Sequence, residues 1–166
     1  MVINLKKIAI VVIAAITMSV TAVAQQRGDK AVGGNLVNEN VSVGMGAKFF
    51  YNVTDPIRVA GEFDYFVKKI YDSYWDASAY FHYLFPLASQ VNLYPSVGVG
   101  VVGSNWSNSY YSFSDINFVL SLGGGIDYEL SSNLLLNGEV RVKMYKGYSN
   151  FLDNSLNFAI GLAYKF

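Results

Sequence analysis

Apolar and non-apolar residues alternate along this chain with a period of two. The stretch 156–166 shows this alternation without a break. Its apolar positions are Leu156, Phe158, Ile160, Leu162, Tyr164 and Phe166, and the positions between them are Asn157, Ala159, Gly161, Ala163 and Lys165. Successive side chains of a β-strand point to opposite faces, so this pattern predicts a strand with one apolar face.

Earlier parts of the chain repeat the pattern. Clear stretches lie at 41–51, 57–67, 75–85, 93–101, 116–128 and 134–144, and a weaker one at 30–37 has Val32, Gly34 and Leu36 as its apolar set. No position on the apolar face of the clear stretches is charged. The opposite face carries ten charged side chains: Lys48, Arg58, Glu62, Asp64, Asp76, Asp127, Glu139, Arg141, Lys143 and Lys165. The two faces must therefore meet very different surroundings.

Alternation alone does not say which face is outside, because a soluble sandwich would bury its apolar face. Two features favour an apolar exterior. The charged face also holds many small residues, which suit a narrow barrel lumen (Ser42, Gly44, Gly46, Ser78, Ser96, Gly98, Gly100, Gly123 and Gly161). The apolar face has aromatic residues near its ends, as girdles at a membrane interface do (Tyr51, Trp75, Tyr83, Phe85, Tyr128, Tyr164 and Phe166).

We therefore predict an all-β fold, an eight-stranded antiparallel transmembrane up-and-down β-barrel. Unpaired backbone groups in hydrocarbon cost several kcal/mol each. The first strand should accordingly pair with the last.

The N-terminus predicts a cleavable signal peptide over residues 1–24, followed by a barrel domain over residues 25–166. Lys6 and Lys7 precede an apolar run at 8–20, and small residues follow at 22–24. Cleavage is expected between Ala24 and Gln25. An anchor helix is the alternative, but the run is short for about 30 Å of hydrocarbon. Export and a lipid-facing barrel predict the outer membrane as the location.

The expected connections fall into two alternating classes. Those at 53–56, 86–90 and 131–133 are short, and those at 38–40, 69–74, 103–114 and 146–153 are expected at the opposite end. Outer-membrane barrels keep short turns at the periplasm, which places the second class outside the cell.

The connection 103–114 is the longest, and we interpret it as an extracellular loop. It offers Trp106, Tyr110, Tyr111 and Phe113 as candidate contacts for an extracellular partner. The alternative is an aromatic girdle that dips into the lipid headgroups.

Motifs that suggest catalysis or cofactor binding have simpler explanations. His82 is the only histidine and is expected inside the barrel near the periplasmic end, where it would be structural. Gly98, Gly100 and Gly103 match a dinucleotide-binding string, but no helix follows to hold a pyrophosphate. We expect no catalytic residue, no metal site and no cofactor.

The charges bear on partners and on conduction. Lys+Arg and Asp+Glu number 12 each, so no basic surface for nucleic acid is expected. The charged inner face could line an ion path. Because side chains fill the lumen of an eight-stranded barrel, a closed network of paired charges is the favoured interpretation.

The sequence resembles the small OmpA/OmpX-like outer-membrane β-barrel family, especially its single-domain members from Bacteroidota. The stretches that carry the resemblance are FFYNVTDPIRVAGEFDYF (49–66), HYLFP (82–86), LYPSVGVG (93–100), GGGIDYELSSNLLLNGEVRVK (123–143) and LNFAIGLAYKF (156–166). The resemblance implies outer-membrane lipid and lipopolysaccharide as surroundings. It also implies insertion by the barrel-assembly machinery, with the terminal Phe166 as the assembly signal.

These observations lead to a non-enzymatic integral barrel with a structural role or a role in adhesion through its loops. A small porin-like channel is the alternative. A lipid-modifying barrel enzyme and a secreted lipocalin-like carrier are further, less favoured alternatives.

Overall fold

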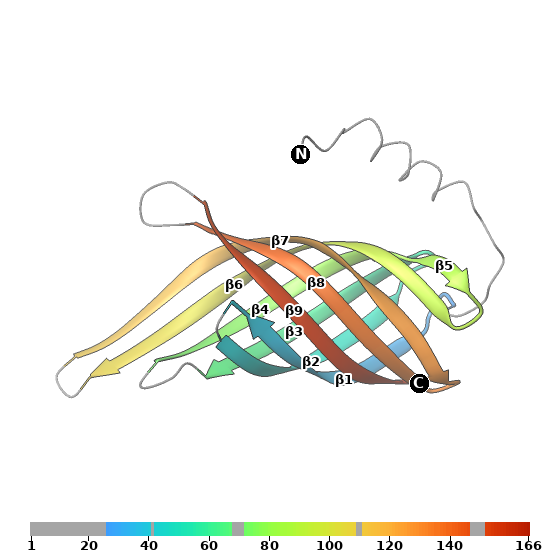
Figure 1. Cartoon of the computed structure of the whole chain (residues 1–166), viewed down its shortest axis with the longest axis horizontal. Coiled ribbons are helices and arrows are strands. Elements are labelled where there is room, and N and C mark those ends of the chain that lie inside the picture. The colour runs from blue at the N-terminus through green and yellow to red at the C-terminus, as the bar shows by residue number, and fades with distance from the viewer. Residues whose placement is uncertain (1–25, 41, 68–71, 109–110, 147–151) are drawn as a thin grey trace.

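The protein forms one β-barrel in a computed structural model, which describes residues 26–40, 42–67, 72–108, 111–146 and 152–166 (Figure 1). Its strands are β1 (Lys30–Glu39), β2 (Ser42–Asn52), β3 (Ile57–Val67), β4 (Asp72–Tyr83), β5 (Phe85–Ala88), β6 (Val91–Asn108), β7 (Tyr111–Ser131), β8 (Leu134–Lys146) and β9 (Leu152–Lys165). Within those ranges, no helix is long and apolar enough to span a membrane. The predicted signal peptide and Gln25 lie outside the described residues.

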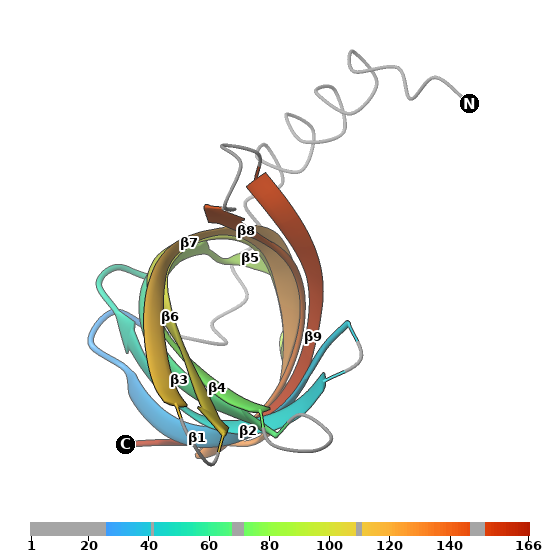
Figure 2. The ribbon, with the colours of Figure 1, turned by 90° about the vertical axis from the view of Figure 1, so that its left-hand side faces the viewer.

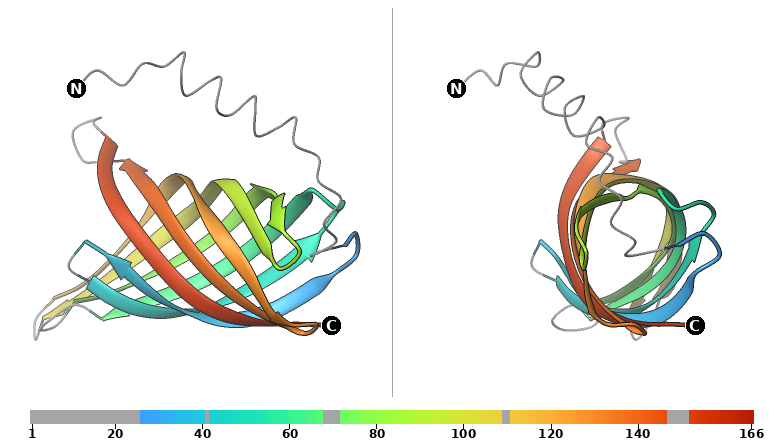
Figure 3. Two further views of the ribbon diagram at one scale, coloured as in Figure 1. Left: turned by 45° about the vertical axis from the view of Figure 1, so that its right-hand side comes forward. Right: turned by 90° about the vertical axis from the view of Figure 1, so that its right-hand side faces the viewer.

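The strands form a closed antiparallel sheet. The order is β4-β3-β2-β1-β9-β8-β7-β6-β5, and β4 also pairs with β6. β4 and β5 lie end to end along β6 and together form one interrupted strand. The barrel therefore has eight strand positions around its circumference. Pairing of β1 with β9 joins the first strand to the last, as predicted. Views from the two ends show the resulting ring (Figure 2; Figure 3, right).

The two faces have the environments that the alternation predicts. On the outside, Leu36 is 60% exposed and Met45 is 67% exposed. On the inside, Arg58, Asp64 and Lys143 are completely buried. The weak first strand follows the same rule and continues two residues beyond the predicted stretch, to Glu39. The barrel is therefore apolar outside and polar inside.

Inward glycines make room for large side chains on neighbouring strands. A Cβ atom at Gly44 would lie 2.8 Å from the ring of Phe66, and one at Gly98 would overlap the ring of Tyr80. Because these inward positions have no side chain, the narrow lumen has room for aromatic rings.

The prediction of a loop at 103–114 is wrong. Most of that segment belongs to β6 and β7, in which Trp106 is the Cα partner of Phe113 and Asn108 that of Tyr111. Its Ser and Asn residues suggested a loop. Two consecutive strands can nonetheless continue to pair wherever their backbone groups face each other, and aromatic residues favour strands.

The predicted turn at 86–90 is shorter than expected. β5 occupies Phe85–Ala88 and pairs with β6, with a register shift between Pro86 and Ala88. Leu84, which interrupts the strand, has a buried side chain. The turn itself is reduced to residues 89–90.

The connections at 53–56, 89–90 and 132–133 lie at one end of the barrel, here called the turn end (Figure 3, left). The C-terminus lies there too, because the amide of Phe166 donates a hydrogen bond to the carbonyl of Lys30 (2.9 Å). The opposite end, here called the hairpin end, holds the short connection after β1. There Asn40 has a φ of 53°, a conformation that asparagine tolerates better than most residues.

Candidate functional site

The features that could carry function are the charged side chains in the lumen and the β6–β7 hairpin. Among the residues that the structure describes, no group of three or more His, Cys, Asp or Glu side chains is placed to hold a metal ion. The lumen charges form three tiers between the turn end and the hairpin end.

The tier nearest the turn end is built around Arg58. Its Nη1 donates to Asp127 (2.5 Å) and its Nε to Nδ1 of His82 (3.1 Å). The guanidinium lies against the rings of Phe50 and Tyr94, at 4.4 and 4.6 Å. His82 itself stacks on Tyr94 with 4.5 Å between ring centroids. His82 is therefore buried inside the barrel near the turn end, where it was predicted to lie, and it accepts a hydrogen bond from a buried arginine.

The middle tier joins opposite walls. Arg141 donates two hydrogen bonds to Glu62, at 3.0 and 2.8 Å, in a bidentate pair, and also contacts Glu139. Lys48 binds Glu139 at 2.6 Å and Glu62 at 3.3 Å. The ring of Tyr80 lies 4.0 Å from the Arg141 guanidinium. Two cations and two carboxylates thus neutralise each other where water is excluded.

The tier nearest the hairpin end is centred on Lys143. Its Nζ lies 3.0 Å from Asp76 and 3.3 Å from Glu39. Asp64, also buried, accepts a hydrogen bond from Asn35 at 3.1 Å. This tier holds more carboxylates than cations.

Nine of the ten predicted interior charges lie in these tiers. Lys165 differs, because it is half-buried at the turn end and pairs with Glu129 at 2.6 Å. Glu39 and Glu129, which also form ion pairs here, were not predicted from the sequence. Glu39 continues the inward positions of β1, a signal that was lost because that strand was expected to end at residue 37.

The tiers determine what the lumen can do. Paired side chains from facing walls cross the lumen at three levels. The side chains of Arg58, Arg141 and Lys143 are among the largest that are completely buried. Such an arrangement fills the barrel and braces its walls.

The β6–β7 hairpin extends beyond its neighbours (Figures 1 and 3). On one side, the pairing of β4 with β6 reaches as far as Trp106. On the other side, the pairing of β8 with β7 reaches only Val119, so within the described part of the chain residues 111–118 of β7 pair with β6 alone. Of the candidate contact residues, Trp106, Tyr111 and Phe113 have their backbone in this hairpin, and Tyr110 lies outside the described residues.

Known structures share this architecture. The N-terminal barrel domain of Pseudomonas aeruginosa OprF superposes with a TM-score of 0.60 at 17% identity, covering 86% of this chain and all of that one. Neisserial surface protein A gives 0.65 at 14% identity over 83% and 95% of the two chains. Ail, the attachment invasion locus protein of Yersinia pestis, gives 0.58 at 18% identity over 85% and 100%. At these identities the similarity concerns the fold.

A comparison with curated protein sequences finds no match. The family comparison does find one, and it spans nearly the whole chain. Residues 8–166 match the model described as an outer membrane protein beta-barrel domain. Together with the closed barrel and its apolar exterior, this match places the chain in the outer membrane and in the family of outer-membrane β-barrel proteins.

Proposed function

We propose that this protein is a non-enzymatic outer-membrane barrel that contacts a partner outside the cell through its β6–β7 hairpin. The observation that carries the proposal is the pairing of residues 111–118 with β6, which extends the hairpin past the described pairing of β8. The wall faces lipid and the lumen is filled, so the segments beyond the membrane are what a water-soluble partner can reach. Exposed connections carry binding more often than the scaffold that positions them.

The composition of the hairpin suggests the kind of partner. Residues 103–115 contain Asp115 but no Lys or Arg, and the rest are aromatic or small and polar. Ail has been solved in complex with a heparin analogue, sucrose octasulfate. A sulfated polyanion does not suit the present hairpin, which has no cation to bind it. Aromatic residues among Ser and Asn suit a protein surface.

The test replaces residues 106–113 with a Gly/Ser segment of equal length. The barrel should still assemble, judged by heat-dependent mobility in SDS gels, because the replaced residues lie at the tip of the hairpin, beyond the pairing of β7 with β8. Binding of bacteria to eukaryotic cells and to immobilised matrix proteins should fall. The matched control places Gly and Ser in the 53–56 turn, at the other end of the barrel, and should leave binding unchanged. Unchanged binding in the hairpin variant would contradict the proposal.

Phe166 is proposed as the signal that the barrel-assembly machinery reads. Its side chain is 65% exposed, and only its backbone is used to pair with β1. A Phe166→Ser variant should therefore refold normally in detergent but assemble poorly in cells. Equal loss in both settings would mean that the side chain serves the fold instead.

A further inference from the structure

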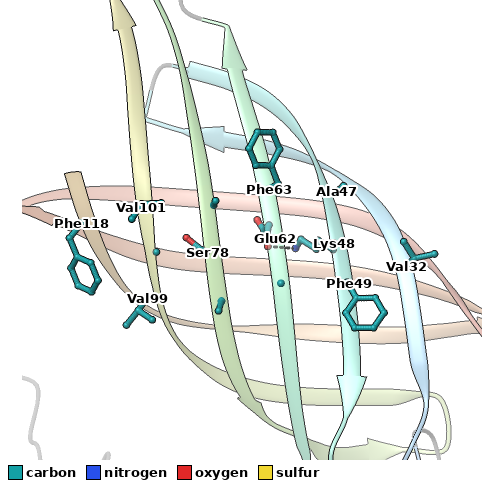
Figure 4. Close-up of a pocket in the computed structure, with 14 residues that line it drawn as sticks. Val32, Ala47, Lys48, Phe49, Glu62, Phe63, Ser78, Val99, Val101 and Phe118 are labelled. Atoms are coloured by element: carbon teal, nitrogen blue, oxygen red, sulfur yellow. Dashed lines mark ion pairs between the residues drawn. The ribbon is translucent and has the colours of Figure 1, made fainter. Parts of the chain in front are cut away.

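An apolar groove lies on the outer wall of the barrel, across β1, β2, β3, β4, β6 and β7 (Figure 4). Its volume is about 630 Å³. Small residues form its floor, namely Gly61, Ala77 and Ala79, and larger apolar side chains stand around them, namely Phe49, Phe63, Val99, Val101 and Phe118.

Strand register creates the groove. In one row across the sheet, Phe49 is paired with Gly61, Gly61 with Ala79 and Ala79 with Val99. In the next row, Phe63 is paired with Ala77, Ala77 with Val101 and Val101 with Phe118. Gly61, Ala77 and Ala79 therefore lie next to one another, with larger residues on either side of them in each row.

Neither packing nor backbone conformation requires the glycine in the floor. A Cβ atom at Gly61 would meet no heavy atom within 4 Å, whereas one at the inward Gly98 would overlap Tyr80. Gly61 has no positive φ. A larger residue at position 61 would fit, and its effect would be to fill the groove.

The groove presents only apolar side chains to its occupant. Lys48 and Glu62 border it but turn their charged groups inward, where they pair at 3.3 Å (Figure 4). Ser78 also points inward and donates its hydroxyl hydrogen to Asp76 (2.5 Å). The groove therefore offers neither a charge nor a hydrogen bond.

We propose that this groove is a binding site for one acyl chain of a membrane phospholipid. It is continuous with the lipid-facing wall of an outer-membrane barrel and lies midway along β3, level with the chains of the bilayer rather than its headgroups. An unfilled apolar hollow loses dispersion contacts, and a flexible hydrocarbon chain restores them. The groove offers no group that could recognise a headgroup, so one chain of a bilayer phospholipid is sufficient to fill it.

Trp75 provides a built-in reporter. It stacks on Phe63 at the wall of the groove, with 6.1 Å between ring centroids. The chain contains two tryptophans, so Trp106→Phe leaves Trp75 alone. Fluorescence from Trp75 should be quenched by phospholipids with brominated chains more strongly in the otherwise wild-type groove than after Gly61→Leu.

The decisive measurement is native mass spectrometry of detergent-purified protein with added dioleoyl phosphatidylethanolamine. The wild type should retain one lipid per chain. Gly61→Leu and Ala79→Leu should each weaken that adduct about tenfold, which corresponds to losing contact with about two methylene groups. The matched control is Gly138→Leu, which adds the same side chain to the outer wall of β8, outside the groove, where a Cβ atom meets Ile126 at an ordinary 3.6 Å.

Heat-dependent gel mobility establishes that each variant is folded, and the two groove variants test the same site independently. Retention of the lipid by Gly138→Leu and its loss from both groove variants would support the proposal. Absence of a wild-type adduct, or equal adducts in all variants, would overturn it. A wild-type dimer that Gly61→Leu abolishes would also overturn it, because a second copy would then fill the groove.

Discussion

Arg141 on β8 and Glu62 on β3 form a bidentate pair across the full width of the barrel, with hydrogen bonds of 3.0 and 2.8 Å. Three strand positions separate β3 from β8 in either direction around the ring, because β4 and β5 share one position. The pair therefore joins diametrically opposite walls. Both side chains are buried. A charge pair in this position links the two walls across the lumen.

The pair should behave as a coupled unit in unfolding experiments. Arg141→Met leaves the Glu62 and Glu139 carboxylates with Lys48 alone, and breaking a buried pair typically costs about 3–5 kcal/mol. Adding Glu62→Gln leaves Lys48 opposite Glu139, a balanced arrangement. The double variant should therefore lose less stability than the sum of the two single variants, measured by urea unfolding in lipid vesicles. Additive losses would mean that the two side chains do not depend on each other.

Replacing an inward glycine by a larger residue should destabilise the barrel, whereas replacing an outward glycine should not. Gly98→Val would push a methyl-bearing carbon into Tyr80 and should cost about 1–3 kcal/mol through overpacking. Gly61→Val points into open space on the outer wall and serves as the control, with little or no loss. Urea midpoints of the two variants provide the comparison. A larger loss at Gly61 would reverse the assignment of the faces.

A charged residue on the outer wall should lower the free energy of unfolding more, the deeper in the bilayer it lies. Val140, 48% exposed near the middle of β8, faces the hydrocarbon, and Val140→Arg should cost about 2–4 kcal/mol. Val53, 40% exposed, lies in a turn at the end of the barrel, and Val53→Arg should cost about 0–1 kcal/mol. Urea unfolding in vesicles measures both. Similar costs at the two sites would be incompatible with a lipid-facing wall at Val140.

The strands and their two faces could be predicted because alternation is a local property. The position of Arg58 within a short alternating stretch is enough to predict that its side chain points inward. The position of Leu36 predicts in the same way that its side chain is exposed. The closing contact between β1 and β9 followed from the need to satisfy every backbone group in lipid.

The partners inside the lumen could not be predicted. Arg141 meets Glu62 because the stagger of the strands brings two distant positions to one level, and no local pattern records that stagger. The groove over Gly61 has the same origin, since it needs small residues of two strands in neighbouring rows. The outer part of the β6–β7 hairpin was predicted as a loop because it is rich in Ser and Asn. Its conformation is determined instead by pairing between the two strands.

A filled lumen would leave recognition to the hairpin, and the conductance of the purified protein in planar lipid bilayers shows whether the lumen is filled. Heat-modifiable, folded wild-type protein should produce no steady current steps above the bare bilayer, while an open porin in the same bilayers serves as the positive control. Large, reproducible and long-lived steps from the pure protein would contradict the account, because ions would then be passing the tiers around Arg58, Arg141 and Lys143.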